Sequence, residues 1–213
     1  MVNEAVRAEA GSAYHHGDLR RAILASTLEI INSAGLEAVS LRRVARHLNV
    51  SEAAPYHHFA SKQDLLAVLA TDAYRGLGER LTSALESAGS DPFDRLRACL
   101  RAYIDYGLES RGRYRLMFGE HMVDLGAYLR AEGHDPGPTR VILEDLIAEC
   151  VGTTEDAKAI ENTAWALSHG ITGLIGEAEI RLGANPDAVQ HLVEVGISIL
   201  TEGIRSYLRS NTS

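Results

Sequence analysis

The amino-acid sequence predicts an all-α protein. Apolar residues recur three or four positions apart in one segment after another, which is the spacing of a helix face buried in a core. Serine, aspartate, glycine or proline bounds most of these segments, as is typical of helix ends. No stretch alternates apolar and polar residues in the manner of a half-buried strand. Helices packed on helices are therefore the expected architecture.

The chain has 213 residues, enough for one or two domains with a sizeable core. It contains no run of about 18 apolar residues and no basic-then-apolar N-terminus, so we expect a cytoplasmic protein that neither spans a membrane nor is secreted. The two cysteines, Cys99 and Cys150, lie outside any paired motif and are expected to be free thiols.

The net charge of −8 is unevenly distributed. Residues 1–60 hold six basic and six acidic side chains, whereas residues 61–213 hold fifteen and twenty-three. Between positions 42 and 62, three arginines and Lys62 are opposed by a single acid, Glu52. A small basic face on an otherwise acidic chain favours a polyanionic partner at that face.

The first sixty residues predict three helices. The first begins near Asp18 and ends at Gly35, since glycine suits the residue that follows a helix. Ser40 caps a short second helix, and Asn49 suits the left-handed residue that ends it. Ser51 is expected to cap a third helix.

In this third helix Pro55 and Phe59 turn inward, while Glu52, Ala53, Tyr56 and His57 remain outside. A capped helix, a tight turn and a short exposed second helix make the helix-turn-helix pattern, whose second helix enters the DNA major groove.

The later elements are also helical. We expect Ser61 to cap a long helix, and we expect Asp91-Pro92 to open another that Ser110-Arg111-Gly112 ends. The predicted helices cover residues 61–88, 91–110, 113–129, 141–151, 154–182 and 185–209, with a loop at 132–138.

The run from Tyr14 to about Leu69 resembles the DNA-binding domain of the tetracycline-repressor (TetR) family. The residues that carry the resemblance are Asp18-Leu19-Arg20, Ala34-Gly35-Leu36, Val44-Ala45, Val50-Ser51, Tyr56-His57-His58-Phe59, Lys62 and Leu65-Leu66. Pro55 departs from the pattern, because many members carry an ordinary helix former there, so the recognition helix is expected to be short or to begin late.

The resemblance implies a DNA-binding domain at residues 14–60 and a helical effector-binding and dimerisation domain at residues 61–213. It implies that Tyr56, His58 and Lys62 bind phosphate, while Glu52, Ala53 and His57 face base edges. The candidate DNA-binding set is Ser40, Arg42, Arg43, Ser51, Glu52, Ala53, Ala54, Tyr56, His57, His58 and Lys62.

The second domain offers a candidate effector pocket. Trp165 and His169 lie four residues apart on one helix face and should stack. The run Arg115 to Gly119 and the Trp165…His169-Gly170 element resemble one branch of the family. The candidate pocket residues are Tyr103, Tyr106, Met117, Phe118, His121, Met122, Trp165 and His169. They are apolar with a few polar tips, as small-molecule pockets are, but the same residues also suit an ordinary core.

Glycines interrupt the last two helices, and each should cost about 1 kcal/mol relative to alanine. Close backbone approach must compensate, either within the subunit or between subunits. The resemblance implies a dimer built as a four-helix bundle from these helices. The candidate interface residues are Gly170, Gly173, Gly176, Gly196, Leu200, Gly203, Ile204 and Tyr207.

We predict no metal and no cofactor. The adjacent histidines of Tyr14-His15-His16 point different ways, and His121, His134 and Asp135 form no recognised ligand spacing. No nucleophile elbow, phosphate loop, HExxH or paired-carboxylate motif is present, which argues against an enzyme.

The predicted function is therefore that of a homodimeric, ligand-responsive transcription regulator, most simply a repressor. It would bind a palindromic operator in double-stranded DNA and be released by a mostly apolar small molecule. The alternative is an all-α small-molecule carrier or enzyme with a vestigial DNA-binding domain.

Overall fold

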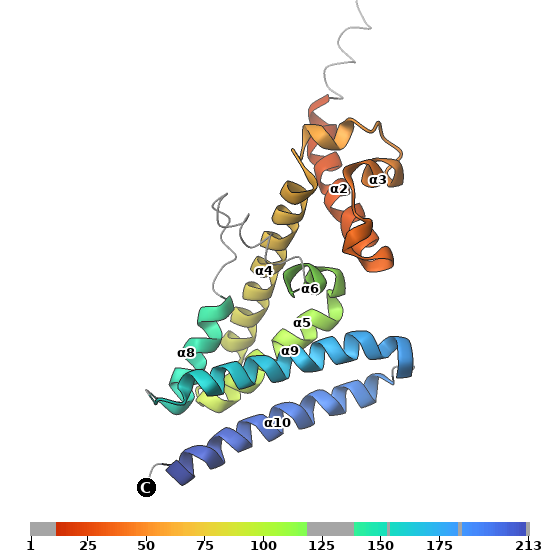
Figure 1. Ribbon diagram of the computed structural model, residues 1–213. Helices are drawn as coiled ribbons and strands as arrows, with labels where there is room; N and C mark the ends of the chain where they lie inside the picture. The colour runs from red at the N-terminus through yellow and green to blue at the C-terminus, as the bar shows by residue number, and fades with distance from the viewer. Residues whose placement is uncertain (1–11, 119–138, 153, 183–184, 212–213) are drawn as a thin grey trace, which may run out of the picture. The chain divides into compact units, whose positions relative to one another are not determined.

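The computed structural model describes residues 12–118, 139–152, 154–182 and 185–211, and every regular element among them is helical (Figure 1). The prediction of an all-α protein is confirmed. Contacts divide the described residues into two compact units, one made of residues 12–71 and 115–118, the other of residues 72–114 and 139–211. The chain passes from one unit to the other inside two helices, α4 and α6. The predicted domain limits at residues 14–60 and 61–213 stay a prediction.

The first unit is a small helical domain. Its elements are α2 (Ser12–Ala34), the 3-10 turn η1 (Leu36–Ala38), α3 (Leu41–His47), the 3-10 turn η2 (Ala54–His57) and the start of α4 (Lys62–Ser87). Helix α2 packs on η1 and α3, and α3 packs on η2. The shared core consists of Ile23, Ile30, Ile31, Val39, Leu41, Val44, Phe59, Leu65, Leu66, Ala67, Leu69, Ala70 and Leu116. Because α3 and η2 bury their apolar sides here, their polar sides are left outside.

The second unit is organised around α5 (Pro92–Glu109), which contacts α8 (Thr139–Val151), α9 (Ala157–Leu182) and α10 (Pro186–Asn211). The remainder of α4 and the start of α6 (Arg111–Phe118) complete it. Asp91 caps α5 by accepting from the N–H groups of Phe93 and Asp94, and Pro92 occupies the first turn, where its missing N–H costs nothing. This start agrees with the prediction.

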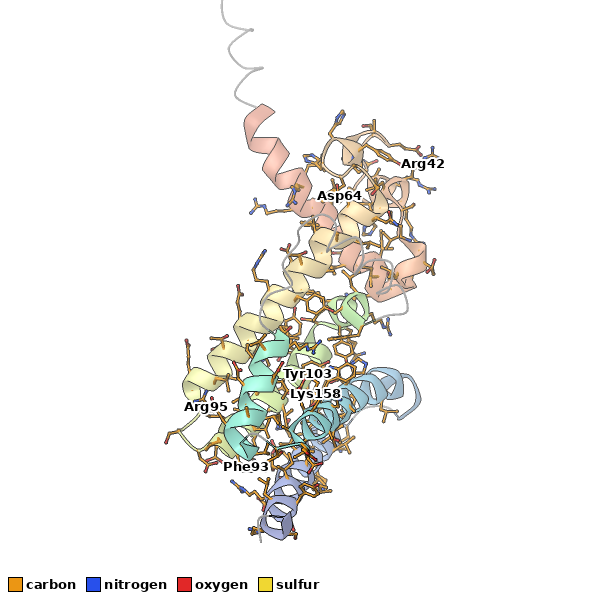
Figure 2. The ribbon with its side chains drawn as sticks, turned by 60° about the vertical axis from the view of Figure 1, so that its left-hand side comes forward. Arg42, Asp64, Phe93, Arg95, Tyr103 and Lys158 are labelled. Carbon is orange, nitrogen blue, oxygen red and sulfur yellow. The ribbon has the colours of Figure 1, made fainter. Side chains whose placement is uncertain are left out.

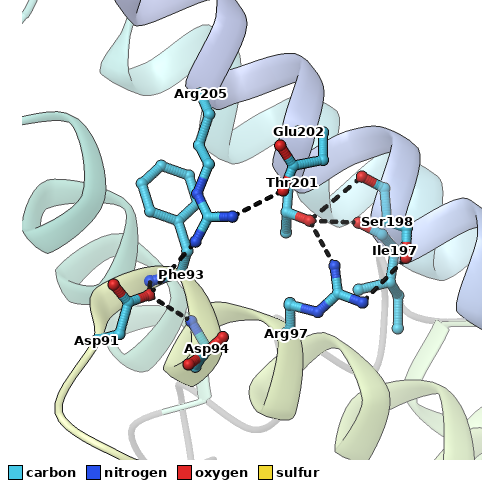
Figure 3. A network of polar contacts seen from close by, with 9 residues as sticks. All are labelled: Asp91, Phe93, Asp94, Arg97, Ile197, Ser198, Thr201, Glu202 and Arg205. Atoms are coloured by element: carbon cyan, nitrogen blue, oxygen red, sulfur yellow. Dashed lines mark hydrogen bonds and ion pairs between the residues drawn. The ribbon is translucent and has the colours of Figure 1, made fainter.

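Side chains of α5 and α10 join the two helices through hydrogen bonds and a cation–π contact (Figure 3). The guanidinium of Arg97 donates to the hydroxyls of Ser198 and Thr201, both at 2.9 Å. Further along α10, the Arg205 guanidinium lies 4.5 Å above the Phe93 ring. These contacts fix which side of α10 faces α5.

Several helix limits differ from the prediction. Helix α2 begins at Ser12 rather than near Asp18. It includes Gly17, although a glycine inside a helix costs about 1 kcal/mol relative to alanine. Helix α6 begins at Arg111 rather than Arg113, since the Ser110 carbonyl already accepts from an N–H of the new helix. Helix α9 begins at Ala157, three residues after the predicted start. The predicted helix end at residues 119–129 and the loop at 132–138 lie outside the described residues.

Candidate nucleic-acid interface and aromatic cluster

The turn between α3 and η2 has the predicted local geometry. Ser40 caps α3 by accepting from the Arg43 N–H at 3.1 Å. Asn49 has a φ of 53°, the left-handed conformation expected of it. The Val50 N–H then donates to the Ala45 carbonyl at 3.0 Å, which closes the corner.

The segment after the turn is a 3-10 helix and not the α-helix that the pattern predicted. Pro55 lies in its first turn and has no N–H to donate, so the chain adopts bonds to the third residue back, such as Tyr56 N–H to the Ala53 carbonyl at 3.1 Å. The predicted cap at Ser51 is also wrong, because its carbonyl and not its side chain accepts from the Ala54 N–H.

The side chains of this segment nevertheless divide as predicted. Pro55 and Phe59 are buried, whereas Tyr56 is 51% exposed. The other exposed residues of the candidate set are Ser40, Arg42, Arg43, Ser51, Glu52, Ala53 and His57, while Ala54, His58 and Lys62 are half-buried. The candidate DNA-binding residues thus lie on α3, on η2 and its flanking residues, and at the start of α4, all within the first unit.

Lys62 opens α4, and its ammonium group bonds to the Leu36 carbonyl at 3.3 Å. Ser61 caps α4 by accepting from the Asp64 N–H, and the Asp64 carboxylate accepts from the Ala60 N–H. Since an ammonium has three donors, the bond to Leu36 leaves Lys62 donors for a phosphate. That bond anchors the side chain and was not foreseen from the sequence.

A hollow of about 480 Å³ lies between α2 and α3. Its lining residues are Glu29, Ile30, Ser33, Arg43, Arg46 and His47. At its edge the Ser26 hydroxyl lies 2.8 Å from His47 Nδ1. With two guanidinium groups and a carboxylate in its wall, the hollow suits polar groups rather than an apolar effector.

The second unit contains an aromatic cluster on α5, α6 and α9, which we define as Tyr103, Tyr114, Trp165 and His169. The Trp165 and His169 rings stack with centroids 5.0 Å apart, as predicted. The Tyr114 hydroxyl lies 2.6 Å from His169 Nδ1, and the Tyr103 hydroxyl lies 3.3 Å from the same atom. The two tyrosine rings meet edge to face, with centroids 6.2 Å apart. The cluster therefore joins three helices through one imidazole.

Burial favours the uncharged forms of the two tyrosines and the histidine of the cluster. Desolvation raises the pKa of Tyr103, with the neighbouring Tyr114 as the next cause, and desolvation also raises the pKa of Tyr114. The pKa of His169 is lowered, again by desolvation. Trp165 is 45% exposed, so the cluster presents an indole surface rather than being closed core.

Tyr114 was missed by the sequence prediction, which concentrated on the methionines and histidines that follow it. A signal lay in Gly107, seven residues earlier on α5. A Cβ added there would lie 2.9 Å from the Tyr114 ring and 2.4 Å from Thr172 Cγ2. Gly107 is therefore what allows Tyr114 and α9 to approach α5.

The other candidate pocket residues lie elsewhere. The buried Tyr106 donates its hydroxyl to the Ala73 carbonyl at 2.7 Å and so fastens α5 to α4. Met117 is buried and Phe118 half-buried, and both belong to the first unit. His121 and Met122 lie outside the described residues. The structure thus brings Tyr103, Trp165 and His169 together with Tyr114.

Among the described residues, no side chain or neighbouring helix packs close against four of the candidate interface glycines. A Cβ added at Gly170, Gly173, Gly176 or Gly203 meets nothing within 4 Å. Large apolar side chains are exposed on the same two helices: Leu174, Leu192, Val195 and Ile199, of which Leu174 and Ile199 are 67% and 69% exposed. Leu192, Val195 and Ile199 are spaced i, i+3, i+7 and form one stripe along α10.

The remaining candidate interface residues are engaged within the chain. A Cβ at Gly196 would lie 2.7 Å from Ile171 Cδ1, so this glycine serves the packing of α10 against α9. Ile204 is buried and Leu200 half-buried. Tyr207 is exposed, but its hydroxyl donates to the Asp156 carboxylate at 2.7 Å.

The described part of the chain lacks the features of a metal site or of a membrane span. It holds no group of three or more His, Cys, Asp or Glu that could bind a metal, and no helix long and apolar enough to cross a bilayer. The candidate metal residues His121, His134 and Asp135 lie outside it, and so do the side chains of His15 and His16. Cys99 and Cys150 are free thiols whose pKa values burial raises to about 12 and about 11.

Comparison with known proteins assigns both parts of the chain to one family. The model described as bacterial regulatory proteins, tetR family, matches residues 23–69. A second model, tetracyclin repressor-like C-terminal domain, matches residues 96–199.

Individual relatives support the same assignment. The HTH-type transcriptional regulator BetI of Burkholderia cenocepacia is 35% identical over 89 residues, which are 41% of this chain and 46% of that protein. The match thus spans about half the length of the curated relatives. A protein of unknown function from Rhodococcus sp. RHA1 is 29% identical with a TM-score of 0.69, over 90% of this chain and 98% of that chain.

A further solved structure shares the fold. AibR, in complex with isovaleryl coenzyme A and operator DNA, is 19% identical with a TM-score of 0.62, over 85% of this chain and 97% of that chain. With family models matching both parts of a chain whose first unit has the helix-turn-helix arrangement, this protein belongs to the tetracycline-repressor family of bacterial regulatory proteins.

Proposed function

We propose that this protein is a DNA-binding transcription regulator, a homodimeric repressor that leaves its operator when a mostly apolar small molecule binds. The observation that carries the proposal is the exposed segment Ser51–His57, presented beside the capped helix α3 by the buried Pro55 and Phe59. Tyr56 is exposed on this segment, where its hydroxyl can donate to a DNA phosphate.

The chemistry of the segment suits both kinds of DNA contact. Tyr56, His58 and Lys62 offer donors to phosphate oxygens, which position a protein on DNA without reading its sequence. Glu52, Ala53 and His57 would meet base edges, where a carboxylate accepts from cytosine N4 and an alanine methyl packs on a thymine methyl. Because the 3-10 segment is short, only a few side chains would contact base edges.

The aromatic cluster is the proposed effector site. Its Trp165 surface supplies an apolar platform, and Tyr103, Tyr114 and His169 supply polar tips without a formal charge. AibR, solved with isovaleryl coenzyme A and operator DNA, is an example of this fold with both kinds of ligand. By linkage, effector and operator would each weaken the binding of the other.

The exposed faces of α9 and α10 are the proposed dimer interface. The open positions at Gly170, Gly173 and Gly203 would let backbones of two subunits approach closely, and Leu174 and Ile199 would be buried. Two subunits would then hold their η2 segments one DNA turn apart, about 34–36 Å.

Footprinting on genomic fragments that include the region upstream of the protein's own gene tests DNA binding. Tyr56→Phe and Lys62→Ala should weaken binding to all sequences alike, and Lys62→Ala should lower the salt slope by about one unit. His57→Ala should instead change the preferred sequence. If the unaltered protein protects no fragment but retains a small molecule, it is a carrier and not a regulator.

The fluorescence of Trp165, the only tryptophan, tests the effector site. A true inducer should change its emission over the concentrations that release DNA. Tyr114→Phe removes the bond to His169 and keeps the ring, so it should shift release to higher effector concentration without loss of operator binding. Equal release by both proteins would place the effector elsewhere.

A further inference from the structure

An ion pair joins the two elements of the DNA-binding surface. Arg42, on the exposed side of α3, holds its Nε 3.6 Å from Oε2 of Glu52, at the start of the segment that precedes η2 (Figure 2 labels Arg42). Both side chains are exposed, 71% for Arg42 and 62% for Glu52. In free solution such a pair contributes little to stability, so the fold does not explain it.

The position of Glu52 makes the pair significant once DNA is bound. Glu52 is the only acid between residues 42 and 62, and it lies on the surface that would meet a polyanion. An unpaired carboxylate there is repelled by the phosphates. When DNA displaces water from this surface, the effective dielectric constant falls and the attraction between guanidinium and carboxylate grows.

Pairing also changes what each residue can do. An arginine engaged by a carboxylate has part of its charge neutralised and is a poorer phosphate ligand. A carboxylate offers about four acceptor positions, so a contact from Arg42 leaves acceptors for a base. The flanking Ser51 and Ala53 have short side chains that cannot hold the carboxylate in place.

We infer that Arg42 is a positioning residue for sequence recognition: through its ion pair it orients the Glu52 carboxylate to accept from the N4 amino group of a cytosine, and it does not itself act mainly as a phosphate ligand. This rests on the proposed function and names the element of the operator that the pair reads. Removing the Arg42 side chain should therefore affect DNA recognition as removal of Glu52 does, and not as loss of a contact to a DNA phosphate does.

Selection from randomised duplexes, followed by titration of the selected duplex and its single-base variants, tests the inference. The proteins are the unaltered chain, Arg42→Ala, Glu52→Ala and the double variant, with Arg46→Ala as a matched control that removes the same charge from the same helix. Arg42 and Glu52 are exposed and outside the core, so these variants should fold.

Glu52→Ala should lose a preference for cytosine at one position of each half-site, about five- to tenfold for a single acceptor contact. Arg42→Ala should lose the same preference at the same position, and the double variant should lose no more than either single one. Arg42→Lys keeps a cation near Glu52 and should retain part of the preference. Arg46→Ala should keep it fully, whatever its effect on overall affinity.

Three results would overturn the inference. If Arg42→Ala weakens binding to every sequence equally, lowers the salt slope by about one unit and keeps the cytosine preference, Arg42 is a phosphate ligand. If Glu52→Ala changes no preference in a protein that binds DNA, Glu52 reads no base. If the unaltered protein selects no duplex, the proposed function itself fails, which is a different outcome from the other two.

Discussion

The substitution Gly173→Leu separates packing within the subunit from packing between subunits. A Cβ at Gly173 meets nothing within 4 Å among the described residues, so we expect a leucine there not to strain the fold of one subunit. It should even favour α9, since leucine is a better helix former than glycine by up to about 1 kcal/mol. In the proposed dimer, a partner packed close to α9 would turn this substitution into a penalty.

The expected magnitude follows from the symmetry of the proposed dimer. Overpacking a close contact costs about 1–3 kcal/mol. In a twofold interface the substitution occurs once in each subunit, so the penalty on the dimer is about 2–6 kcal/mol. Each 1.4 kcal/mol is tenfold, so the dissociation constant should rise by roughly 30-fold to 10⁴-fold. Operator binding should fall with it, because one half-site offers few contacts.

Sedimentation or light scattering over a dilution series measures this dissociation constant, and circular dichroism checks that the helices remain. Thr82→Leu is the matched control, because it adds the same side chain at an exposed position on α4, away from α9 and α10. It should leave dimerisation unchanged. A Gly173→Leu protein that is helical and dimerises as tightly as the unaltered chain would refute the proposed interface, and so would an unaltered chain that is monomeric.

Three further predictions concern stability. Gly107→Ala should lower the urea midpoint, because its Cβ would lie 2.4 Å from Thr172 Cγ2. Overpacking of up to about 3 kcal/mol should exceed the gain of about 1 kcal/mol in helix propensity, and a rise in the midpoint would contradict the packing described. Ser61→Ala should cost about 1 kcal/mol in the same assay, because the Asp64 N–H loses its acceptor, and an unchanged midpoint would mean that water replaces the cap. Burial lowers the pKa of His169 from 6.5, so the unfolded chain binds more protons just below that pH; the stability contributed is fully present above pH 6.5 and is lost as the pH falls towards the folded value. Urea titrations at several pH values should show a shallower loss for His169→Gln, and identical slopes would contradict this.

Local signals accounted for most of the first unit. The cap at Ser40, the left-handed Asn49 and the inward Pro55 and Phe59 depend on neighbours within a few residues, so the sequence alone predicted them correctly. The start of α2, the cap at Ser51 and the 3-10 form of η2 were the exceptions. Pro55 was recognised as a departure that would shorten or delay the helix, but the pattern did not predict that the segment would form a 3-10 turn.

The sequence by itself thus determined the fold class, the order of the helices and the exposure of the segment Ser51–His57, because period and capping are local properties of a chain. Only the tertiary structure decided which partners long side chains choose: Glu52 with Arg42, Lys62 with the Leu36 carbonyl, and His169 with Tyr114. It also separated Gly173, with open space beside it, from Gly196, which packs on Ile171. These outcomes depend on contacts between residues far apart in the chain. Helical periodicity indicates which face of each helix is apolar, but it does not indicate which helix packs against that face.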